Sequence, residues 1–312
     1  MVVGTYQKGS IMTTATVSRT CPLCASSSHS REFAKESYDP KRLGAFAFAS
    51  RKIPEYMHYR LVLCEDCDLL YASPVPESDR LEDEYREASY DSGREARYAA
   101  RTYARLVQPI LARLRDRTGA LDIGAGDGAF LKELLGCGFT GVVGAEPSAA
   151  PISAAEESIR PLLRHAPFRA EDFRGERFSL ITCFQTLEHV PDPLQLCRDA
   201  FALLKEGGAM LCIVHNRLSV SARLLGRRSP IYDIEHLQLF SHPSAQRLFQ
   251  SAGFHDVRSY MVCNRYPISY WMRLFPMPDG LKRAAIVAAN AIGIGRLPVS
   301  VPAGNLAVYG FK

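Results

Sequence analysis

An apolar segment followed by three glycines at alternate positions constrains the fold of this chain more than any other feature. Leu121–Ile123 has the pattern of a buried strand end, and Gly124, Gly126 and Gly128 follow it in the run LDIGAGDGAFL. Glycine lets the backbone turn sharply and approach a ligand closely, because no Cβ intervenes. A helical apolar pattern then begins near Asp127. The run therefore predicts a strand, a glycine loop and a helix, a unit that places ligands at the carboxyl ends of strands in an open α/β sheet.

Two acidic residues narrow the class of ligand. Asp122 precedes the first glycine, and Glu146 ends the next apolar segment, 24 residues further along the chain. In dinucleotide-binding domains the glycines follow the pattern G-x-G-x-x-G, and a pyrophosphate lies at the helix N-terminus. An acidic residue at the position of Asp122 would repel a pyrophosphate, but it suits a ligand that carries an amino group. A carboxylate at the position of Glu146 can accept hydrogen bonds from both hydroxyls of a ribose.

This pattern resembles the class I S-adenosylmethionine (SAM) methyltransferases, and a nicotinamide-binding domain is the alternative interpretation. The resemblance implies SAM as cofactor. The cofactor-binding candidates are Asp122, Gly124, Gly126, Gly128, Glu146, Pro147, Phe184 and Gln185.

Alternating strand and helix patterns predict a parallel sheet with helices on both faces. Their order resembles the seven-stranded, Rossmann-like class I methyltransferase sheet, an α/β fold whose last two strands form an antiparallel pair. The expected strands are 119–123, 141–146, 161–165, 178–184, 208–214, 255–263 and 304–311. The expected helices are 127–137, 148–157, 193–205 and 243–252.

Four regions are expected along the chain. Residues 1–20 form a disordered lead, 21–76 a zinc-binding module, 77–118 a helical connector and 119–312 the SAM-binding methyltransferase domain. An insertion over 264–303 lies between the last two strands and is expected to cap the substrate pocket.

Two Cys-x-x-Cys pairs predict a metal site in the N-terminal module. Cys21 and Cys24 form the first pair, and Cys64 and Cys67 form the second. Four cysteines in this arrangement match the ligands of a tetrahedral, structural zinc ion. A redox dithiol or two disulfides are the alternatives, and a cytoplasmic location would disfavour both. We therefore expect bound Zn²⁺ with a structural role.

The segment QTLEHVPDP at 185–193 follows the expected fourth strand of the α/β domain. It resembles a signature of the broad SAM methyltransferase family, in which this loop borders both the methyl donor and the acceptor. The resemblance places Gln185 near the methionine part of SAM and His189 near the acceptor. The alternative is that Glu188 and His189 cap the helix that begins near Pro193.

A second pair of acidic and imidazole side chains lies in the segment YDIEHLQLFS at 232–241. Glu235 and His236 are adjacent, so an irregular loop can turn both toward a pocket. A histidine supported by a carboxylate can act as a general base near neutral pH. The alternative is a buried histidine that bonds the backbone and anchors the loop. Ser241 is the expected N-cap of the following helix.

The order of cysteine module, SAM domain and Glu-His pair resembles the bacterial nucleotide-sugar C-methyltransferases of deoxysugar biosynthesis, over residues 21 to about 256. The resemblance implies His236 as a base that removes a proton next to a sugar carbonyl, with Glu235 as its partner and His189 and Tyr90 as pocket groups. Asp233 stands where that family has a tyrosine. That family also continues into a long extra domain beyond the last sheet strand. The ending at 304–306 is instead similar to methyltransferases of surface-polysaccharide and secondary-metabolite clusters, so carbon and oxygen both stay open as methylated atoms.

Composition and charge disfavour several classes of protein. The chain has 312 residues, 47% of them hydrophobic and 23% charged, as is usual for globular domains. The net charge of +5 is mild and the basic residues are scattered, which argues against a nucleic-acid partner. The apolar stretch 284–295 is too short to span a bilayer, and residues 1–20 lack the apolar segment of a signal peptide. We expect a cytoplasmic monomer or homodimer without a membrane span.

The sequence thus predicts a SAM-dependent methyltransferase of a small-molecule acceptor, a nucleotide-linked sugar or a secondary metabolite, with base-assisted in-line transfer. One alternative is an RNA methyltransferase that uses the cysteine module as an RNA-binding ribbon. The other is a non-catalytic protein with a vestigial SAM site. The scattered charge and the lack of an Asn-Pro-Pro-Tyr-type motif after the fourth strand argue against the first. The intact glycines and acidic residues argue against the second.

Overall fold

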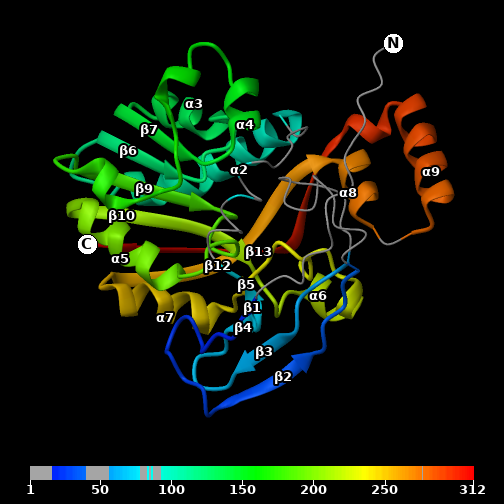
Figure 1. The fold of residues 1–312 in the computed structure, drawn as a ribbon. Helices are drawn as coiled ribbons and strands as arrows, with labels where there is room; N and C mark the ends of the chain where they lie inside the picture. Colours follow the sequence, from blue (N-terminus) through cyan, green and yellow to red (C-terminus); the bar gives the residue numbers. More distant parts are fainter. Residues whose placement is uncertain (1–15, 40–55, 78–82, 84–85, 87–92, 276) are drawn as a thin grey trace, which may run out of the picture.

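The computed structural model describes residues 16–39, 56–77, 83, 86, 93–275 and 277–312. Three sheets organise this part of the chain. A large sheet carries most of the helices, a small sheet of four strands lies below it, and a third sheet has only two strands (Figure 1).

The large sheet has seven strands in the order β12-β13-β10-β9-β6-β7-β8. Strand β13 runs antiparallel to both of its neighbours, while β10, β9, β6, β7 and β8 are mutually parallel. This arrangement confirms the predicted fold class. The strands are β6 (Thr118–Ile123), β7 (Thr140–Glu146), β8 (Leu163–His165), β9 (Phe178–Phe184), β10 (Leu204–His215), β12 (His255–Pro267) and β13 (Pro298–Phe311).

Helices cover both faces of this sheet because successive strand residues point to opposite sides. Leu121 and Ile181 pack in one core with α5 and α7, while Ala120 and Leu180 pack in the other with α2 and α3. The helices are α2 (Gly93–Leu111), α3 (Ala129–Gly136), α4 (Ala149–Ala154), α5 (Pro193–Leu203), α6 (Val220–Leu225), α7 (His242–Ala252), α8 (Ile268–Leu274) and α9 (Asp279–Ala291). Among the described residues, no helix is both long enough and apolar enough to cross a membrane.

The small sheet is not built from the N-terminal region alone. Its order is β11-β4-β3-β2, and β11 comes from the segment between α6 and α7. The strands are β2 (Ser30–Ala34), β3 (Leu61–Cys64), β4 (Leu70–Ala72) and β11 (Gln238–Leu239). The separate module expected over 21–76 is therefore completed by a strand from the domain expected over 119–312.

Residues 16–20 differ from the disordered lead that was expected over 1–20. Strand β1 (Thr16–Val17) pairs with β5 (Val75–Pro76), and the Arg19 backbone N–H donates to Ser73 Oγ at 2.9 Å. Two residues of strand carry too little periodicity to be recognised in a polar sequence. Residues 1–15 lie outside the described part of the chain.

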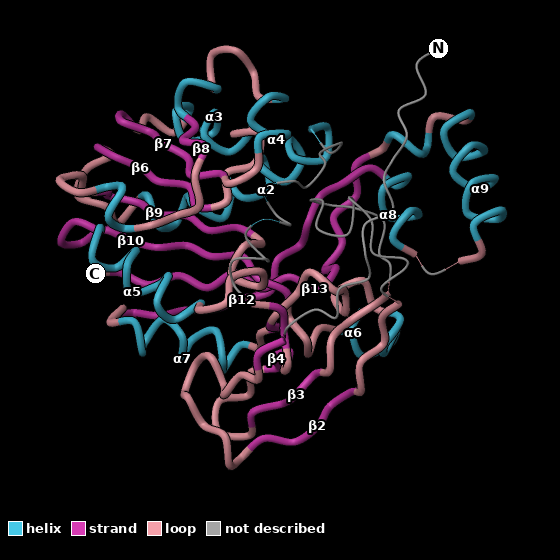
Figure 2. Tube along the Cα trace, in the orientation of Figure 1, coloured by secondary structure: helices cyan, strands magenta, loops and turns pink. Residues whose placement is uncertain are grey.

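The segment expected as an insertion over 264–303 begins as a continuation of the sheet. Strands β12 and β13 pair as far as Pro267 and Pro298, and α8 and α9 follow at the tip (Figure 2). In the expected connector over 77–118, the structure describes helix α2, whereas Tyr90 lies outside the described residues.

Candidate functional site

The glycine loop between β6 and α3 combines two packing requirements with one open face. Gly124, Gly126 and Gly128 all have left-handed backbone angles, with φ values of 74°, 57° and 71°. A Cβ on Gly124 would lie 2.2 Å from Thr186 Oγ1, and one on Gly128 would lie 2.5 Å from Ile159 Cγ2. A Cβ on Gly126 would meet no atom within 4 Å among the described residues. The first and third glycines thus serve internal packing, while the middle one borders open space that a ligand can occupy.

Glu146, the last residue of β7, contacts the backbone of the middle glycine. Its Oε2 accepts a hydrogen bond from the Gly126 N–H and its Oε1 accepts one from the Ser148 N–H, both at 2.8 Å. A carboxylate has about four acceptor positions, so each oxygen can accept one further hydrogen bond. Burial raises the pKa of Glu146 to about 7, although both backbone donors favour the charged form. The side chain can therefore bind two adjacent hydroxyls, as the predicted ribose contact requires.

Asp122 lies on the neighbouring strand β6 and is buried as deeply. The Thr182 hydroxyl donates to Asp122 Oδ1 at 2.7 Å, across the pair formed by β6 and β9. Burial raises the pKa of Asp122 to about 7, and the charge of Glu146 adds to the shift. Two carboxyl groups and the loop therefore share one edge of the sheet, where parallel strands place their carboxyl ends.

The remaining cofactor candidates lie around this edge. The Phe184 ring packs against Tyr103 and Phe130, with centroids 4.5 and 4.7 Å away. Pro147 is half-buried, and its carbonyl lies 3.1 Å from His165 Nε2. Gln185 has a left-handed φ of 50°, and its N–H donates to the Ile213 carbonyl at 2.7 Å.

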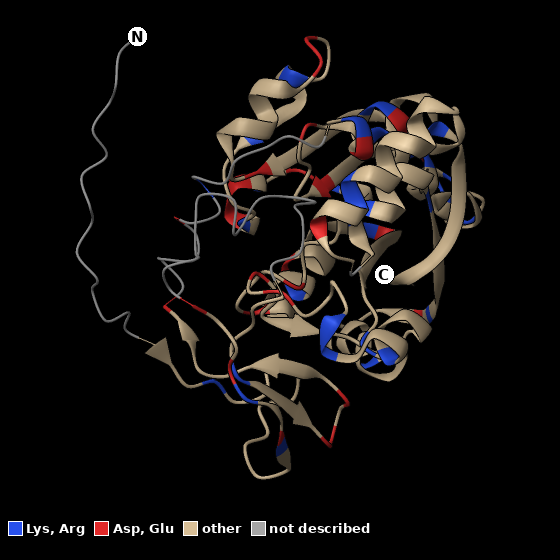
Figure 3. Ribbon diagram, turned by 90° about the vertical axis from the view of Figure 1, so that its right-hand side faces the viewer, with Lys and Arg blue, Asp and Glu red and all other residues tan. Residues whose placement is uncertain are grey.

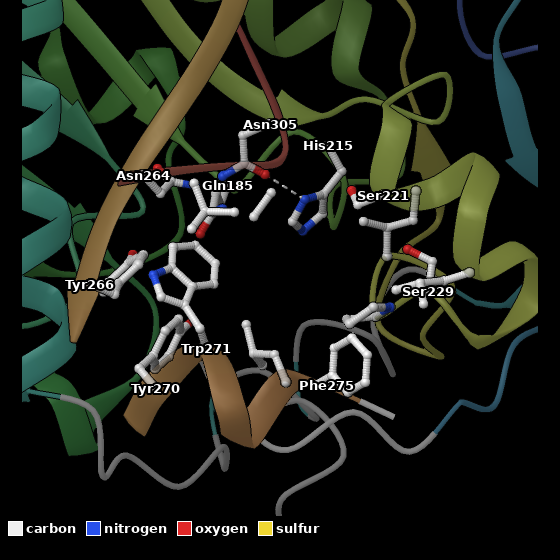
Figure 4. A pocket seen from close by; sticks show the side chains of 16 residues that line it. Gln185, His215, Ser221, Ser229, Asn264, Tyr266, Tyr270, Trp271, Phe275 and Asn305 are labelled. Atoms are coloured by element: carbon white, nitrogen blue, oxygen red, sulfur yellow. Dashed lines mark hydrogen bonds between the residues drawn. The ribbon is translucent and has the colours of Figure 1, made fainter. Parts of the chain in front are cut away.

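Gln185 also lines a cavity of about 250 Å³ (Figure 4). Polar side chains of Gln185, His215, Asn264 and Asn305 lie on one side of it. Aromatic side chains from the end of β12 and from α8 lie on the other side. The segment between β12 and β13 thus forms one wall of the cavity, in the position expected for a capping insertion.

His215 is a site candidate that the sequence interpretation missed. It ends β10, and its Nδ1 lies 2.9 Å from Asn305 Oδ1 on β13. An amide oxygen only accepts, so Nδ1 carries the proton and Nε2 is left as an acceptor. Burial lowers the pKa of His215 to about 4, which keeps the ring neutral. Its position in the sequence could have identified it, because His215 ends an apolar strand at the same edge of the sheet as Glu146 and Gln185.

Of the predicted catalytic histidines, His236 lies next to His215 and His189 lies next to His236, but neither is part of the described lining of the cavity. His236 is centred 4.7 Å from the His215 ring and 5.1 Å from the His189 ring. His236 Nδ1 lies 2.8 Å from the Ile231 carbonyl, and His189 Nδ1 lies 3.0 Å from the Glu235 carbonyl. Both rings therefore hold the backbone of the 231–236 loop, as in the anchoring alternative.

Glu235 lies near the predicted base, with its Oε1 3.7 Å from His236 Nε2. Glu188 connects segments instead of capping a helix: its Oε1 accepts from the His215 N–H at 2.6 Å, and its carbonyl accepts from the Leu237 N–H at 2.7 Å. Burial raises the pKa of Glu188 to about 8. Asp192 caps α5 by accepting from the Gln195 N–H at 2.9 Å, so the capping alternative for Glu188 and His189 is wrong.

The four predicted metal ligands converge. Cys21, Cys24, Cys64 and Cys67 have sulfur atoms that all lie within 4.8 Å of one another. The Cys21–Cys67 and Cys24–Cys64 distances are 3.4 and 3.5 Å. A tetrahedral zinc ion with Zn–S bonds of about 2.3 Å holds its sulfurs about 3.8 Å apart. The donor set thus fits zinc.

The second cysteine pair is docked onto the loop that carries the Glu-His pair. The Asp68 carboxylate forms an ion pair with Arg217, and the Ala72 N–H donates to the Leu237 carbonyl at 2.8 Å. Apolar side chains of the two regions share one core, which includes Met57, Leu61, Leu70, Ile231, Tyr232, Ile234 and Leu237. Ile231 also lines the cavity. The cysteine module is therefore part of the support for one cavity wall.

Comparisons with known proteins assign the chain to a family. Residues 95–259, more than half of the chain, match a family described as a methyltransferase domain. A ubiquinone biosynthesis O-methyltransferase of Coxiella burnetii is 32% identical over 102 residues, which cover 31% of this chain and 43% of the relative. One of the same name from Aeromonas salmonicida is 27% identical over 49% of this chain and 69% of the relative. The chain spans less than half the length of the first of these relatives.

A solved structure with a similar arrangement is a SAM-dependent methyltransferase of Thermotoga maritima, a possible histamine N-methyltransferase. It is 17% identical, with a TM-score of 0.43, over 69% of this chain and 91% of that one. From the match over residues 95–259, the chain belongs to the methyltransferase-domain family.

Proposed function

We propose that this protein is a SAM-dependent methyltransferase that methylates a small organic molecule bound in the cavity beside Gln185. The observation that carries the proposal is the open space at Gly126, whose backbone N–H donates to the Glu146 carboxyl group. It occurs in a chain of the methyltransferase-domain family. SAM supplies a methyl group that is already activated on a sulfonium.

The residues of the chain then have to bind and orient the two reactants. Glu146 accepts the ribose hydroxyls, and Gly126 leaves room for the ligand next to the backbone. Asp122 provides negative charge for the amino group of the methionine part. Gln185 borders both this edge and the cavity. Positioning of reacting atoms supplies much of the rate in a transfer of this kind.

The acceptor belongs to one of the classes expected from the sequence, a sugar or a secondary metabolite, with the methyl group placed on carbon or oxygen. The names of the curated relatives support oxygen. Lys and Arg are interspersed with Asp and Glu over the helices in Figure 3, which supports a small molecule over RNA. In transfer to a hydroxyl, the oxygen gains the methyl group, the C–S bond breaks and the hydroxyl proton leaves. His236, with Glu235 beside it, remains the proposed base.

We assign the four cysteines to a structural zinc ion. Zinc with four thiolate ligands has no open coordination position, so its role is to stabilise the fold. Here that role extends to the 231–239 segment, which shares a sheet and a core with the cysteine module.

Calorimetric titration with S-adenosylhomocysteine (SAH) tests the donor site. We expect Gly126→Val to weaken SAH binding at least about 100-fold, because the branched side chain fills the open space and its φ of 57° disfavours a β-branched residue. Gly175→Val is the matched control, since Gly175 also has a positive φ and open surroundings but precedes β9 at the other edge of the sheet. No SAH binding by the wild type, or equal binding by Gly126→Val, would contradict the proposal.

A further inference from the structure

The side chains that line the cavity beside Gln185 restrict the chemical class of the acceptor more than the volume of the cavity does. Its polar groups and its aromatic groups lie on different sides (Figure 4). The polar side is formed where β10, β12 and β13 run together, and the aromatic side is formed by the end of β12 and by α8.

Two polar atoms of the cavity lining are unpaired within the described part of the chain. Asn264 Oδ1 and Ser229 Oγ are buried without a hydrogen-bond partner, and their residues are 4% and 1% exposed. His215 Nε2 can also accept a hydrogen bond, because Nδ1 carries the proton toward Asn305. A buried polar atom without a partner destabilises the folded protein. These atoms therefore favour a ligand that brings hydroxyl or N–H donors.

The described lining contains no Asp, Glu, Lys or Arg side chain. His215 is neutral, since burial lowers its pKa to about 4. A ligand group with a full charge would have to leave water without an opposite charge to receive it, which is strongly unfavourable. The part of the acceptor that enters the cavity is therefore uncharged.

Aromatic rings form the opposite wall. The Tyr266 and Tyr270 rings are centred 4.2 Å apart, and Trp271 lies against both, at 5.4 and 5.5 Å. Phe275 continues this wall toward Ser229. Offset and edge-to-face contacts between rings add stabilisation beyond their buried area. A flat ring is the shape that such a wall binds best.

We propose that the cavity binds an uncharged, hydroxylated aromatic ring, whose hydroxyls donate to Asn264 Oδ1 and His215 Nε2 while its face packs against Tyr270 and Trp271. This inference rests on the proposed function and names the acceptor class of the same site. It selects against a nucleotide-linked sugar, whose diphosphate would meet no cation in the described lining. It also selects against a free sugar, which carries many hydroxyls and no aromatic face.

Catechol is the probe, titrated into wild-type protein with and without saturating SAH. Trp271 is the only tryptophan of the chain and lines the cavity, so its fluorescence reports binding at this place. We expect catechol to change Trp271 emission. We expect 1,2-dimethoxybenzene, which lacks donors, to bind about tenfold or more weakly, because the hydrogen bonds to buried acceptors are lost. Calorimetry with 3,4-dihydroxybenzoate and with glucose should show binding weaker by at least the same factor.

Asn264→Leu removes the buried acceptor while keeping the side-chain size. We expect about tenfold weaker catechol binding and unchanged SAH affinity, which also reports that the variant is folded. Asn290→Leu on the exposed side of α9 is the control. Absent catechol binding, equal binding of glucose or 3,4-dihydroxybenzoate, or a wild-type response in Asn264→Leu would overturn the inference while SAH binding stands. Absent SAH binding would overturn the proposed function instead, and the titration without SAH still tests the cavity.

Discussion

The two halves of the proposed site are built in different ways. The donor half is local: Asp122, the glycine loop and Glu146 lie on one strand, its loop and the next strand. The acceptor half is assembled from Gln185, His215, the 264–275 segment and the 301–305 segment. One of its walls includes Ile231, which also belongs to the core of the cysteine module. The comparison teaches that the donor half depends on a short sequence pattern, whereas the acceptor half depends on packing between segments that are far apart in the sequence.

Removing one zinc ligand should separate the halves most clearly. We expect Cys64→Ser to lower the zinc content and to raise hydrogen exchange over 231–241, because that segment pairs with β4 and shares the module's core. The Trp271 response to catechol should fall about tenfold or more, while SAH affinity stays within about twofold, as expected for sites with separate supports. Metal analysis, exchange measured by mass spectrometry and calorimetry provide the three readings.

Cys137→Ser is the control, since Cys137 ends α3 outside the cysteine cluster. Wild-type protein without zinc would contradict the assigned zinc site. Loss of SAH binding together with catechol binding in Cys64→Ser would show that the two halves are not supported separately.

The two halves should also differ in how ligand binding depends on pH, because, among the described residues, only the donor half contains carboxyl groups with raised pKa values. Burial raises the pKa of Glu146 to about 7, whereas ribose hydroxyls need its carboxylate form as acceptor. SAH affinity should therefore rise as the pH increases from about 6 to about 8, by up to about tenfold per unit below the pKa. Because the folded pKa exceeds the unfolded value, stability of the ligand-free protein should fall between about pH 4.5 and pH 7 and then level off.

Glu146→Gln separates this group from Asp122, whose pKa is also near 7. The variant should bind SAH more weakly at pH 8 and show a smaller rise with pH. Catechol binding should change little over the same range, because the described cavity lining holds no carboxylate. An unchanged pH profile in Glu146→Gln would assign the dependence to another group.

Two helix caps give the smallest expected effects. Ser241 caps α7, and its hydroxyl also lies 3.4 Å from the Asp68 carbonyl of the cysteine module, whereas Asp192 caps α5. Replacement of either by Ala should lower the free energy of unfolding by about 1 kcal/mol. Only Ser241→Ala should also weaken the Trp271 response to catechol. Denaturant unfolding and the same titration test this, and an equal effect of both variants on catechol would contradict it.

The parts that could be predicted from sequence are those that follow from local periodicity. The apolar run before Gly124 and the one before Glu146 predict β6 and β7 within one residue. Two Cys-x-x-Cys pairs predict the convergence of their four sulfur atoms. Each pair already holds its two cysteines close together, so only one contact between the pairs is needed to bring Cys21, Cys24, Cys64 and Cys67 together.

The acceptor half could not be predicted in the same way. His215 ends one strand and Asn264 lies within another. Whether the two side chains come together depends on which strands become neighbours in the sheet. Strand β11 has two residues, and its partner β4 belongs to what looked like a separate module. The predicted roles of His236 and His189 rest on a resemblance and, for His236, on the adjacent Glu235. Their contacts with backbone carbonyls instead depend on how the 231–236 loop folds.

The pairing of β11 with β4 has a consequence for synthesis of the chain. Leu239 pairs with Leu70, so the edge of β4 stays without this partner until most of the polypeptide has left the ribosome. An exposed strand edge beside apolar side chains is a template for incorrect pairing between chains. The early cysteine module must therefore wait for a late segment, and translation speed between the two should affect how much protein aggregates.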